Sequence, residues 1–190
     1  DSEKLKIIKR LHGNSRNTYN MLVNLLEWSR TQRGLIKPEF LSIPLFDSAD
    51  SSILFLKQRF EDKKHRIINN IDKDIKVFAD VNLLLNIFNN LLNNAIKFTP
   101  EGGEILVSAK RVDSYVELEI TDNGIGIPIE QQDKLFNLDS SFSRKGTNDE
   151  LGTGLGLLTC KEFVSLMNGI CRLESEDGEG TSFFIKLKSA

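Results

Sequence analysis

The sequence predicts an α+β fold, a two-layer sandwich in which helices cover one face of a mixed sheet, preceded by a long bundle helix. Three observations lead to this prediction. Residues 3–33 repeat apolar side chains at three- and four-residue spacing, and residues 81–98 show the pattern of a second long helix. Several stretches on either side of that second helix alternate apolar and polar residues, which is typical of strands.

The first 36 residues form the predicted bundle helix, and residues 37–190 form a separate predicted domain. Residues 3–33 contain no proline and a single glycine, and Gly34 is the predicted stop. One amphipathic helix cannot bury its own apolar stripe, so we expect a partner helix from residues before Asp1 or from another chain. The stripe consists of Leu5, Ile8, His12, Ser15, Tyr19, Leu22, Leu26 and Ser29.

Short elements follow the bundle helix. Residues 38–46 are predicted to form an edge strand because Pro44 cannot donate to a ladder. Residues 47–61 have a helical period, with Asp47 or Ser48 as the expected N-cap. Residues 65–71 and 75–80 read as two more strands, and His65 is expected at the surface or at the strand boundary.

The second half of the chain alternates hairpins and helices. Asp80 is the expected N-cap of the helix over 81–98. Residues 104–112 and 114–122 form a predicted hairpin around Asp113 and Ser114. A loop rich in glycine and serine then runs to Gly152, a helix is expected from about Thr153 to Met167, and a last hairpin joins residues 171–176 to 181–187. All strands are expected in one mixed sheet.

Composition restricts the functional classes. The formal net charge is −2, so the overall charge gives no argument for nucleic-acid binding. No apolar run approaches the roughly 20 residues that a membrane span needs, so any membrane attachment is expected from segments outside this sequence. Cys160 and Cys171 have no metal-ligand spacing and are expected to be small core residues in a reducing compartment.

Asparagines in the helix over 81–98 raise the first question about function. Asn90, Asn94 and Lys97 stand at i, i+4 and i+7 and form one stripe, on the face opposite to Val81, Leu84 and the other apolar residues. A solvated polar face is the simplest interpretation. Such a face would be better built from Glu, Lys and Gln, however, because asparagine is a poor helix former. Amide oxygens can hold a hard cation and lysine can bind phosphate, so a Mg²⁺–polyphosphate ligand also explains the stripe.

The segment TDNGIGIP, residues 121–128, is the second candidate site element. Asp122 ends a strand, where a carboxylate can be held rigidly, and Gly124 and Gly126 let the backbone approach a flat ligand. A carboxylate that accepts from an exocyclic amine, together with isoleucine side chains, can recognise a purine. Taken alone, this segment is equally compatible with an ordinary turn.

The segment GTGLGL, residues 152–157, is the third. Glycines at the start of a helix expose backbone N–H groups that can cradle phosphates. The segment lacks the GK[ST] ending of a P-loop and the GxGxxG pattern at a strand exit that marks a dinucleotide site. A lone glycine-rich turn is a weak signal.

Together and in this order, the three segments are a specific signal for one protein family. NNLLNNAIKFT, DNGIGIP, LFNLDSSFS and GTGLGLLTCKEFV resemble the N, G1, F and G2 boxes of sensor histidine kinases, which are part of the GHKL ATPase superfamily. The resemblance covers residues 37–190, and the segment SRNTYNMLVNLLEWSRTQRG resembles the second helix of the dimerisation and histidine-phosphotransfer hairpin.

The resemblance implies a role for each matching position. Asn94 would coordinate Mg²⁺, and Asn90 and Lys97 would face the phosphates of ATP as the catalytic set. Asp122 would accept from the adenine amino group, and positively charged Arg144 or Lys145 could reach the γ-phosphate. The remaining implied nucleotide-binding residues are Phe98, Gly124, Gly126, Ile127, Phe136, Gly152, Gly154, Leu155, Gly156 and Thr181.

The chain departs from the family at the phosphoacceptor. No H-box sequence is present, and His12 reads as a histidine packed on a helix interface, so the acceptor is expected before Asp1. The resemblance implies a kinase that transfers the ATP γ-phosphoryl to a histidine and then to a response-regulator aspartate. The whole protein would be a dimer formed through the hairpin, cytoplasmic or anchored in the inner membrane. Two alternatives stay open: a non-kinase ATPase of the same superfamily, and a degenerate kinase that acts as a nucleotide-binding or docking module.

Overall fold

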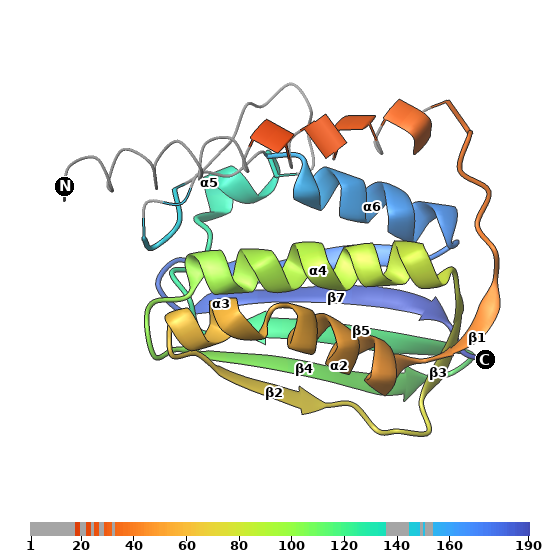
Figure 1. The fold of residues 1–190 in the computed structure, drawn as a ribbon, viewed down its shortest axis with the longest axis horizontal. Helices are drawn as coiled ribbons and strands as arrows, with labels where there is room; N and C mark the ends of the chain where they lie inside the picture. Colours follow the sequence, from red (N-terminus) through yellow and green to blue (C-terminus); the bar gives the residue numbers. More distant parts are fainter. Residues whose placement is uncertain are drawn as a thin grey trace, which may run out of the picture.

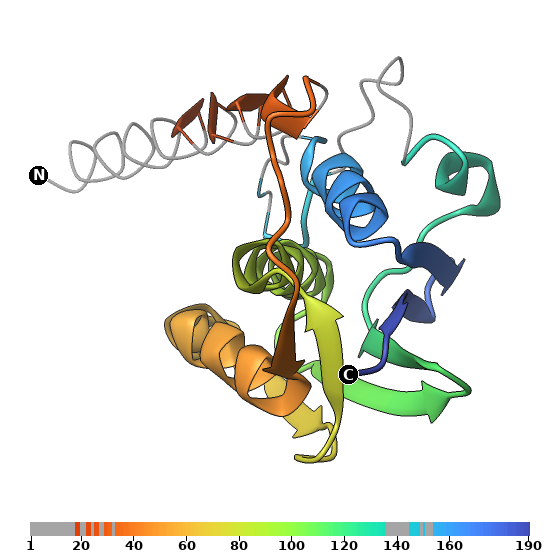
Figure 2. The same ribbon diagram turned by 90° about the vertical axis from the view of Figure 1, so that its right-hand side faces the viewer.

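Two layers make up the described part of the predicted domain, residues 37–190. The structure, a computed structural model, describes residues 18–19, 22–23, 25–26, 29–31, 33–135, 145–148, 150 and 154–190. A five-stranded sheet forms one layer, and the helices α2 (Leu45–Phe55), α4 (Val81–Phe98) and α6 (Gly156–Leu166) lie together on one of its faces (Figures 1 and 2). This arrangement confirms the predicted α+β sandwich.

The main sheet has the strand order β2-β4-β5-β7-β6. Only β2 and β4 pair in parallel, and the other neighbours are antiparallel, so the sheet is mixed as predicted. The bounds are β2 (Arg66–Asn70), β4 (Glu104–Val112), β5 (Tyr115–Asp122), β6 (Ile170–Glu176) and β7 (Gly180–Lys188). The predicted hairpin turn at Asp113 is confirmed, and this residue has a left-handed φ of 56°.

The prediction of a single sheet is wrong in one respect. Strands β1 (Leu41–Pro44) and β3 (Lys76–Ala79) form a separate antiparallel pair, with Ile43 opposite Val77. Pro44 ends β1, and α2 begins at the next residue, so this strand stays at an edge. The pair adjoins the main sheet through an isolated bridge between Val77 and Ser189.

Helix α2 begins earlier than predicted. Pro44 occupies the N-cap position and makes no side-chain cap bond, so the expected caps Asp47 and Ser48 are wrong. The Ser48 hydroxyl instead donates to the Pro44 carbonyl from inside the helix, at 3.0 Å. The predicted single helix also breaks at Leu56, after which α3 (Lys57–Asp62) continues.

Helix α4 matches its prediction closely. The Asp80 carboxylate accepts from the N–H groups of Asn82 and Leu83 at 2.8 and 3.1 Å, as expected of an N-cap. The apolar side of the helix supplies the centre of the core, although Val81 is 41% exposed rather than buried. The fully buried members are Leu84, Ile87, Phe88, Leu91, Leu92 and Ile96.

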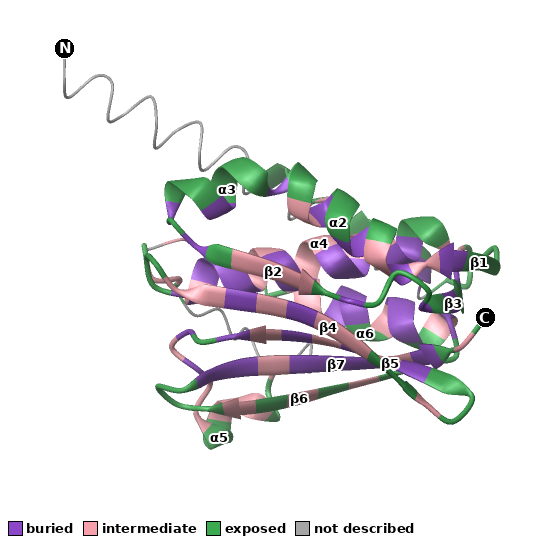
Figure 3. Ribbon diagram, turned by 90° about the horizontal axis from the view of Figure 1, so that it is seen from below, coloured by how far each residue is buried: buried purple, intermediate pink, exposed green. Residues whose placement is uncertain are grey.

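The core lies between α4, α6 and the inner face of the sheet, and Figure 3 shows buried positions along α4 and β7. Cys160 is buried and Cys171 is half-buried, and both thiols are free, as expected. His65 directly precedes β2, as expected of a strand boundary, but it is only 9% exposed, so the alternative of a surface position is wrong.

The described positions between Thr18 and Thr31 are helical, and Gly34 has a φ of 64°, which is typical of a helix C-cap. Tyr19, Leu22 and Leu26 are exposed, as expected of a helix that needs a partner. Among the described residues, no helix has the length and apolar character needed to cross a bilayer.

Candidate functional site

The polar stripe of α4 is not a solvated face. Asn90 and Asn94 are half-buried, and Lys97 is only 8% exposed. The Lys97 ammonium lies 4.5 Å from the centre of the Phe98 ring, a cation–π distance. Asn93 has a different role, because Arg59 of α3 donates to its amide oxygen. The stripe of Asn90, Asn94 and Lys97 is therefore partly to fully buried.

Asp122 closes one end of this region. It ends β5 opposite Thr181 of β7, and it is 6% exposed. Burial raises the pKa of Asp122 to about 6, although the backbone N–H groups of Gly124 and Thr181 donate to its carboxylate and oppose the rise. A buried carboxylate with spare acceptor capacity can accept a further donor from a ligand.

The two glycines after Asp122 are required by the protein itself. A Cβ on Gly124 would lie 2.5 Å from the Phe98 carbonyl oxygen, and a Cβ on Gly126 would overlap the carbonyl oxygen of Glu176. Gly126 also has a φ of 60°. Both glycines therefore let this loop pack against α4 and the β6–β7 hairpin. Their role in admitting a flat ligand stays a prediction.

Side chains that the sequence did not single out hold the same loop. The Ser175 hydroxyl accepts from the Ile127 N–H at 2.9 Å and donates to the Gly180 carbonyl at 2.7 Å. The Gln132 amide of α5 (Ile129–Gln132) donates to the Ile127 and Ser175 carbonyls, both at 2.8 Å. No sequence signal marked these residues, and two of the contacts, from Ile127 to Ser175 and from Gln132 to Ser175, join residues that lie 48 and 43 positions apart.

The glycine turn before α6 meets the asparagine stripe. Helix α6 begins at Gly156, later than the predicted start near Thr153, and Leu155 precedes it without a side-chain cap. A Cβ on Gly156 would lie 3.2 Å from the Asn90 amide oxygen, so this turn and α4 are in close contact. Gly154 is exposed and has a φ of 71°. Phe136, Arg144, Gly152 and Thr153 lie outside the described residues.

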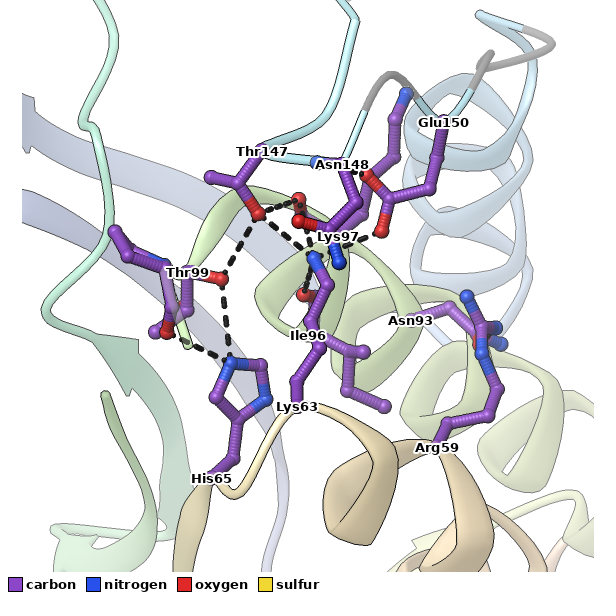
Figure 4. Close-up of polar contacts among 11 residues, drawn as sticks. Arg59, Lys63, His65, Asn93, Ile96, Lys97, Thr99, Thr147, Asn148 and Glu150 are labelled. Carbon is purple, nitrogen blue, oxygen red and sulfur yellow. Dashed lines mark hydrogen bonds and ion pairs between the residues drawn. The ribbon is translucent and has the colours of Figure 1, made fainter. Parts of the chain in front are cut away.

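The C-terminal end of α4 joins the site to two further segments (Figure 4). The last carbonyl groups of a helix have no partner within the helix. Lys63 donates to the Ile96 and Lys97 carbonyls at 2.8 and 3.2 Å, and the Thr147 N–H donates to the Lys97 carbonyl at 3.0 Å. Ile125 of the Asp122 loop donates its N–H to the Phe98 carbonyl at 3.1 Å.

A surface depression lies beside Asp122. Its volume is about 350 Å³, and its lining includes Asp122 and Thr181 together with the carboxylates of Glu174, Glu176 and Glu179. Because these carboxylates would repel phosphate, we place the phosphate part of the candidate site along α4 instead. There the three predicted segments meet, since Asn90 contacts the glycine turn and Phe98 contacts the Asp122 loop.

Comparison with known proteins identifies the family of the chain. The family described as histidine kinase-, DNA gyrase B-, and HSP90-like ATPase matches residues 79–190. The sensory kinase SasA of Thermosynechococcus vestitus is 35% identical over 134 residues, which cover 70% of this chain and 35% of that protein. The kinase BarA of Escherichia coli K12 is 30% identical over 190 residues, which cover 95% of this chain and 20% of BarA. The chain therefore spans about a third or less of these relatives.

Solved structures share the fold. Full-length ShkA in complex with AMPPNP superposes with a TM-score of 0.80 at 22% identity, over 99% of this chain and 39% of ShkA. The mycobacterial sensor histidine kinase MprB gives a TM-score of 0.68 at 28% identity, over 80% of this chain and 98% of that structure. The chain belongs to the family of histidine kinase-, DNA gyrase B- and HSP90-like ATPases, and it carries the ATP-binding domain of a sensor histidine kinase.

Proposed function

We propose that the surface between α4, the Asp122 loop and the glycine turn binds Mg·ATP. The observation that carries the proposal is the meeting of these segments around one half-buried polar stripe, from Asn90 to Lys97. Asp122 would accept from the adenine amino group, and Thr181 beside it and Ile127 would line the base. The structure of ShkA with AMPPNP supports a nucleotide at this fold.

The donor chemistry of the stripe fits a metal–phosphate group. Among the described residues, no three His, Cys, Asp or Glu side chains gather into a metal site. Asn94 would give Mg²⁺ a neutral amide oxygen, while phosphate oxygens would supply the anionic ligands. Bound Mg²⁺ neutralises charge on the phosphates. Asn90, Lys97 and the backbone N–H groups at the start of α6 would bind and orient the phosphates.

The activity that best fits this site is transfer of the γ-phosphoryl group to a histidine. A nitrogen of the imidazole would form the new bond to phosphorus, while the bond from phosphorus to the bridging oxygen breaks and ADP leaves. Such a transfer depends mainly on positioning and charge neutralisation, which the stripe provides. The histidine would come from a phosphotransfer hairpin that pairs in a homodimer. A structure of ThkA with the response regulator TrrA, whose fold this chain shares with a TM-score of 0.77, supports a receiver domain as the next acceptor.

The test supplies the acceptor and follows its phosphorylation. The chain is joined to a helical hairpin that contains an H-box histidine, and γ-labelled ATP is added with Mg²⁺. We expect an acid-labile, alkali-stable label that is lost when the histidine is replaced by glutamine. Tight Mg·ATP binding without a label would contradict the kinase proposal and favour a nucleotide-binding module. Steady ATP hydrolysis without the hairpin would instead indicate a non-kinase ATPase.

A further inference from the structure

One buried lysine, which neither the sequence motifs nor the proposed function includes, lies next to the phosphate side of the candidate site. Lys63 follows α3 and is 5% exposed. Its ammonium lies among four oxygen atoms: those of the Ile96 and Lys97 carbonyls, the Thr147 hydroxyl at 2.8 Å and the Glu150 carboxylate at 2.7 Å (Figure 4). A lysine this deeply buried needs such partners, because an unpaired buried charge is strongly unfavourable.

Glu150 connects this lysine to the stripe. One of its carboxylate oxygens binds Lys63, and the other accepts from the Asn148 N–H at 2.8 Å. Gly146, in the same short loop, lies against the stem of Lys97, because a Cβ there would be 2.5 Å from the Lys97 Cγ. The Glu150 carboxylate is therefore held close to two lysines.

The charges of Lys63, Lys97 and Glu150 shift the pKa values of Lys97 and Glu150. Burial lowers the pKa of Lys97, the nearby Glu150 carboxylate acts against this, and Lys63 adds to it. Burial raises the pKa of Glu150, but hydrogen bonds from Lys63 and the Asn148 N–H hold that pKa below its ordinary value. Glu150 is thus a carboxylate whose charge Lys63 compensates. Without Lys63, the same charge would act on Lys97 alone and would also repel a bound phosphate.

We propose that Lys63 is a positioning residue for phosphate recognition: it binds Glu150 and the carbonyl groups of the last turn of α4, so that Glu150 does not cancel the charge of Lys97. This role rests on the proposed function, because it assumes that Lys97 faces the phosphates. It makes Lys63 necessary for binding the phosphate part of the nucleotide and unnecessary for binding its base.

The experiment measures two ligands separately. Calorimetry gives the affinity for Mg·AMPPNP, and an NMR titration gives the affinity for adenosine, which has no phosphates. We expect Lys63→Met to weaken Mg·AMPPNP binding by about tenfold or more, while adenosine affinity stays within about twofold. The double variant Lys63→Met/Glu150→Gln is expected to regain most of the lost affinity, because the uncompensated carboxylate is gone.

If Lys63 only stabilised the fold, the result would be different. Both ligands would then weaken together, and removing Glu150 would restore nothing, which would overturn the proposal. The matched control is Lys64→Met, at the next position, where the side chain is exposed and pairs with Glu101 on the surface. This control should bind both ligands as the wild type does.

A second variant keeps the test decisive if Lys63→Met does not fold. Glu150→Gln leaves Lys63 its other three oxygen partners and keeps an amide oxygen that can accept from it, so this variant should fold, and it should bind Mg·AMPPNP at least as tightly as the wild type does. A tenfold loss in this variant would contradict the proposal. If the wild type itself did not bind Mg·AMPPNP, the proposed function would fail, whereas normal binding by every variant would refute only the role of Lys63.

Discussion

Asp122 combines an unfavourable effect on stability with a proposed role in binding adenine. Its pKa is raised from 3.8 to about 6 because it is buried. The folded state then holds its proton more tightly than the unfolded state, so stability is lost as the pH rises from 3.8 to about 6. The cost is complete above pH 6, and at about 1.4 kcal/mol per pKa unit it amounts to roughly 3 kcal/mol.

We therefore predict that Asp122→Asn stabilises the ligand-free protein at pH 7, by up to about 3 kcal/mol, and abolishes nucleotide binding. Urea unfolding at pH 4 and pH 7, with calorimetry for Mg·AMPPNP, measures both effects. The gain in stability should disappear at pH 4, where the carboxyl group is protonated in the folded state. Glu119→Gln, on the opposite face of the same strand, is the control and should change neither quantity. Normal nucleotide affinity in Asp122→Asn would remove the adenine pocket.

Asn94 gives a prediction about the metal. If its amide oxygen binds Mg²⁺, then Asn94→Ala should lose the part of AMPPNP affinity that depends on Mg²⁺, and affinity in EDTA should hardly change. The control is Asn86→Ala on the same helix, since the Asn86 amide is bound to the Asn82 carbonyl at 3.0 Å. Calorimetry with and without Mg²⁺ separates these outcomes. An equal loss in both conditions would show that Asn94 does not act through the metal.

At the scale of elements, the loop after β5 depends on one close contact. Gly126 and Gly178 both have positive φ values, 60° and 88°, but only at Gly126 would a Cβ meet another backbone atom. We predict that Gly178→Ala costs about 1 kcal/mol of stability, the cost of left-handed backbone alone. Gly126→Ala should cost clearly more stability, because the added Cβ would push the loop away from Glu176 at the end of β6. The displaced loop should also bind adenosine more weakly. Equal unfolding free energies for the two variants would contradict this.

The elements themselves could be predicted from the sequence to different degrees. The cap at Asp80 and the period of α4 are local signals, and both proved correct. The pairing of β1 with β3 was not predicted, because a two-residue period shows that a strand exists but not which strand lies beside it. Ser48 misled the prediction of the N-cap, since a serine hydroxyl can bind a carbonyl inside a helix as well as cap its start.

At the scale of the whole molecule too, local sequence patterns predict only part of the candidate site. Short segments of unusual composition predicted Asn90, Lys97, Asp122 and Gly156. Lys63 lies in the run Lys63-Lys64-His65, which reads as an ordinary charged surface, yet Lys63 is buried and Lys64 is exposed. Only the folded chain brings Lys63 to the end of α4, so no local pattern could reveal it.

Ligand binding by the whole domain gives the last prediction. The proposed site joins α4, the Asp122 loop and the glycine turn, and in an unfolded chain these segments are apart. A ligand that binds only the folded state adds a free energy that grows with its concentration, about 2.7 kcal/mol at one hundred times the dissociation constant. Mg·AMPPNP should therefore raise the melting temperature progressively in the wild type and not in Asp122→Asn. If Mg·AMPPNP raised the melting temperature of both proteins equally, the nucleotide would bind at some other place in the fold. The convergence of the three segments would then have no bearing on its binding.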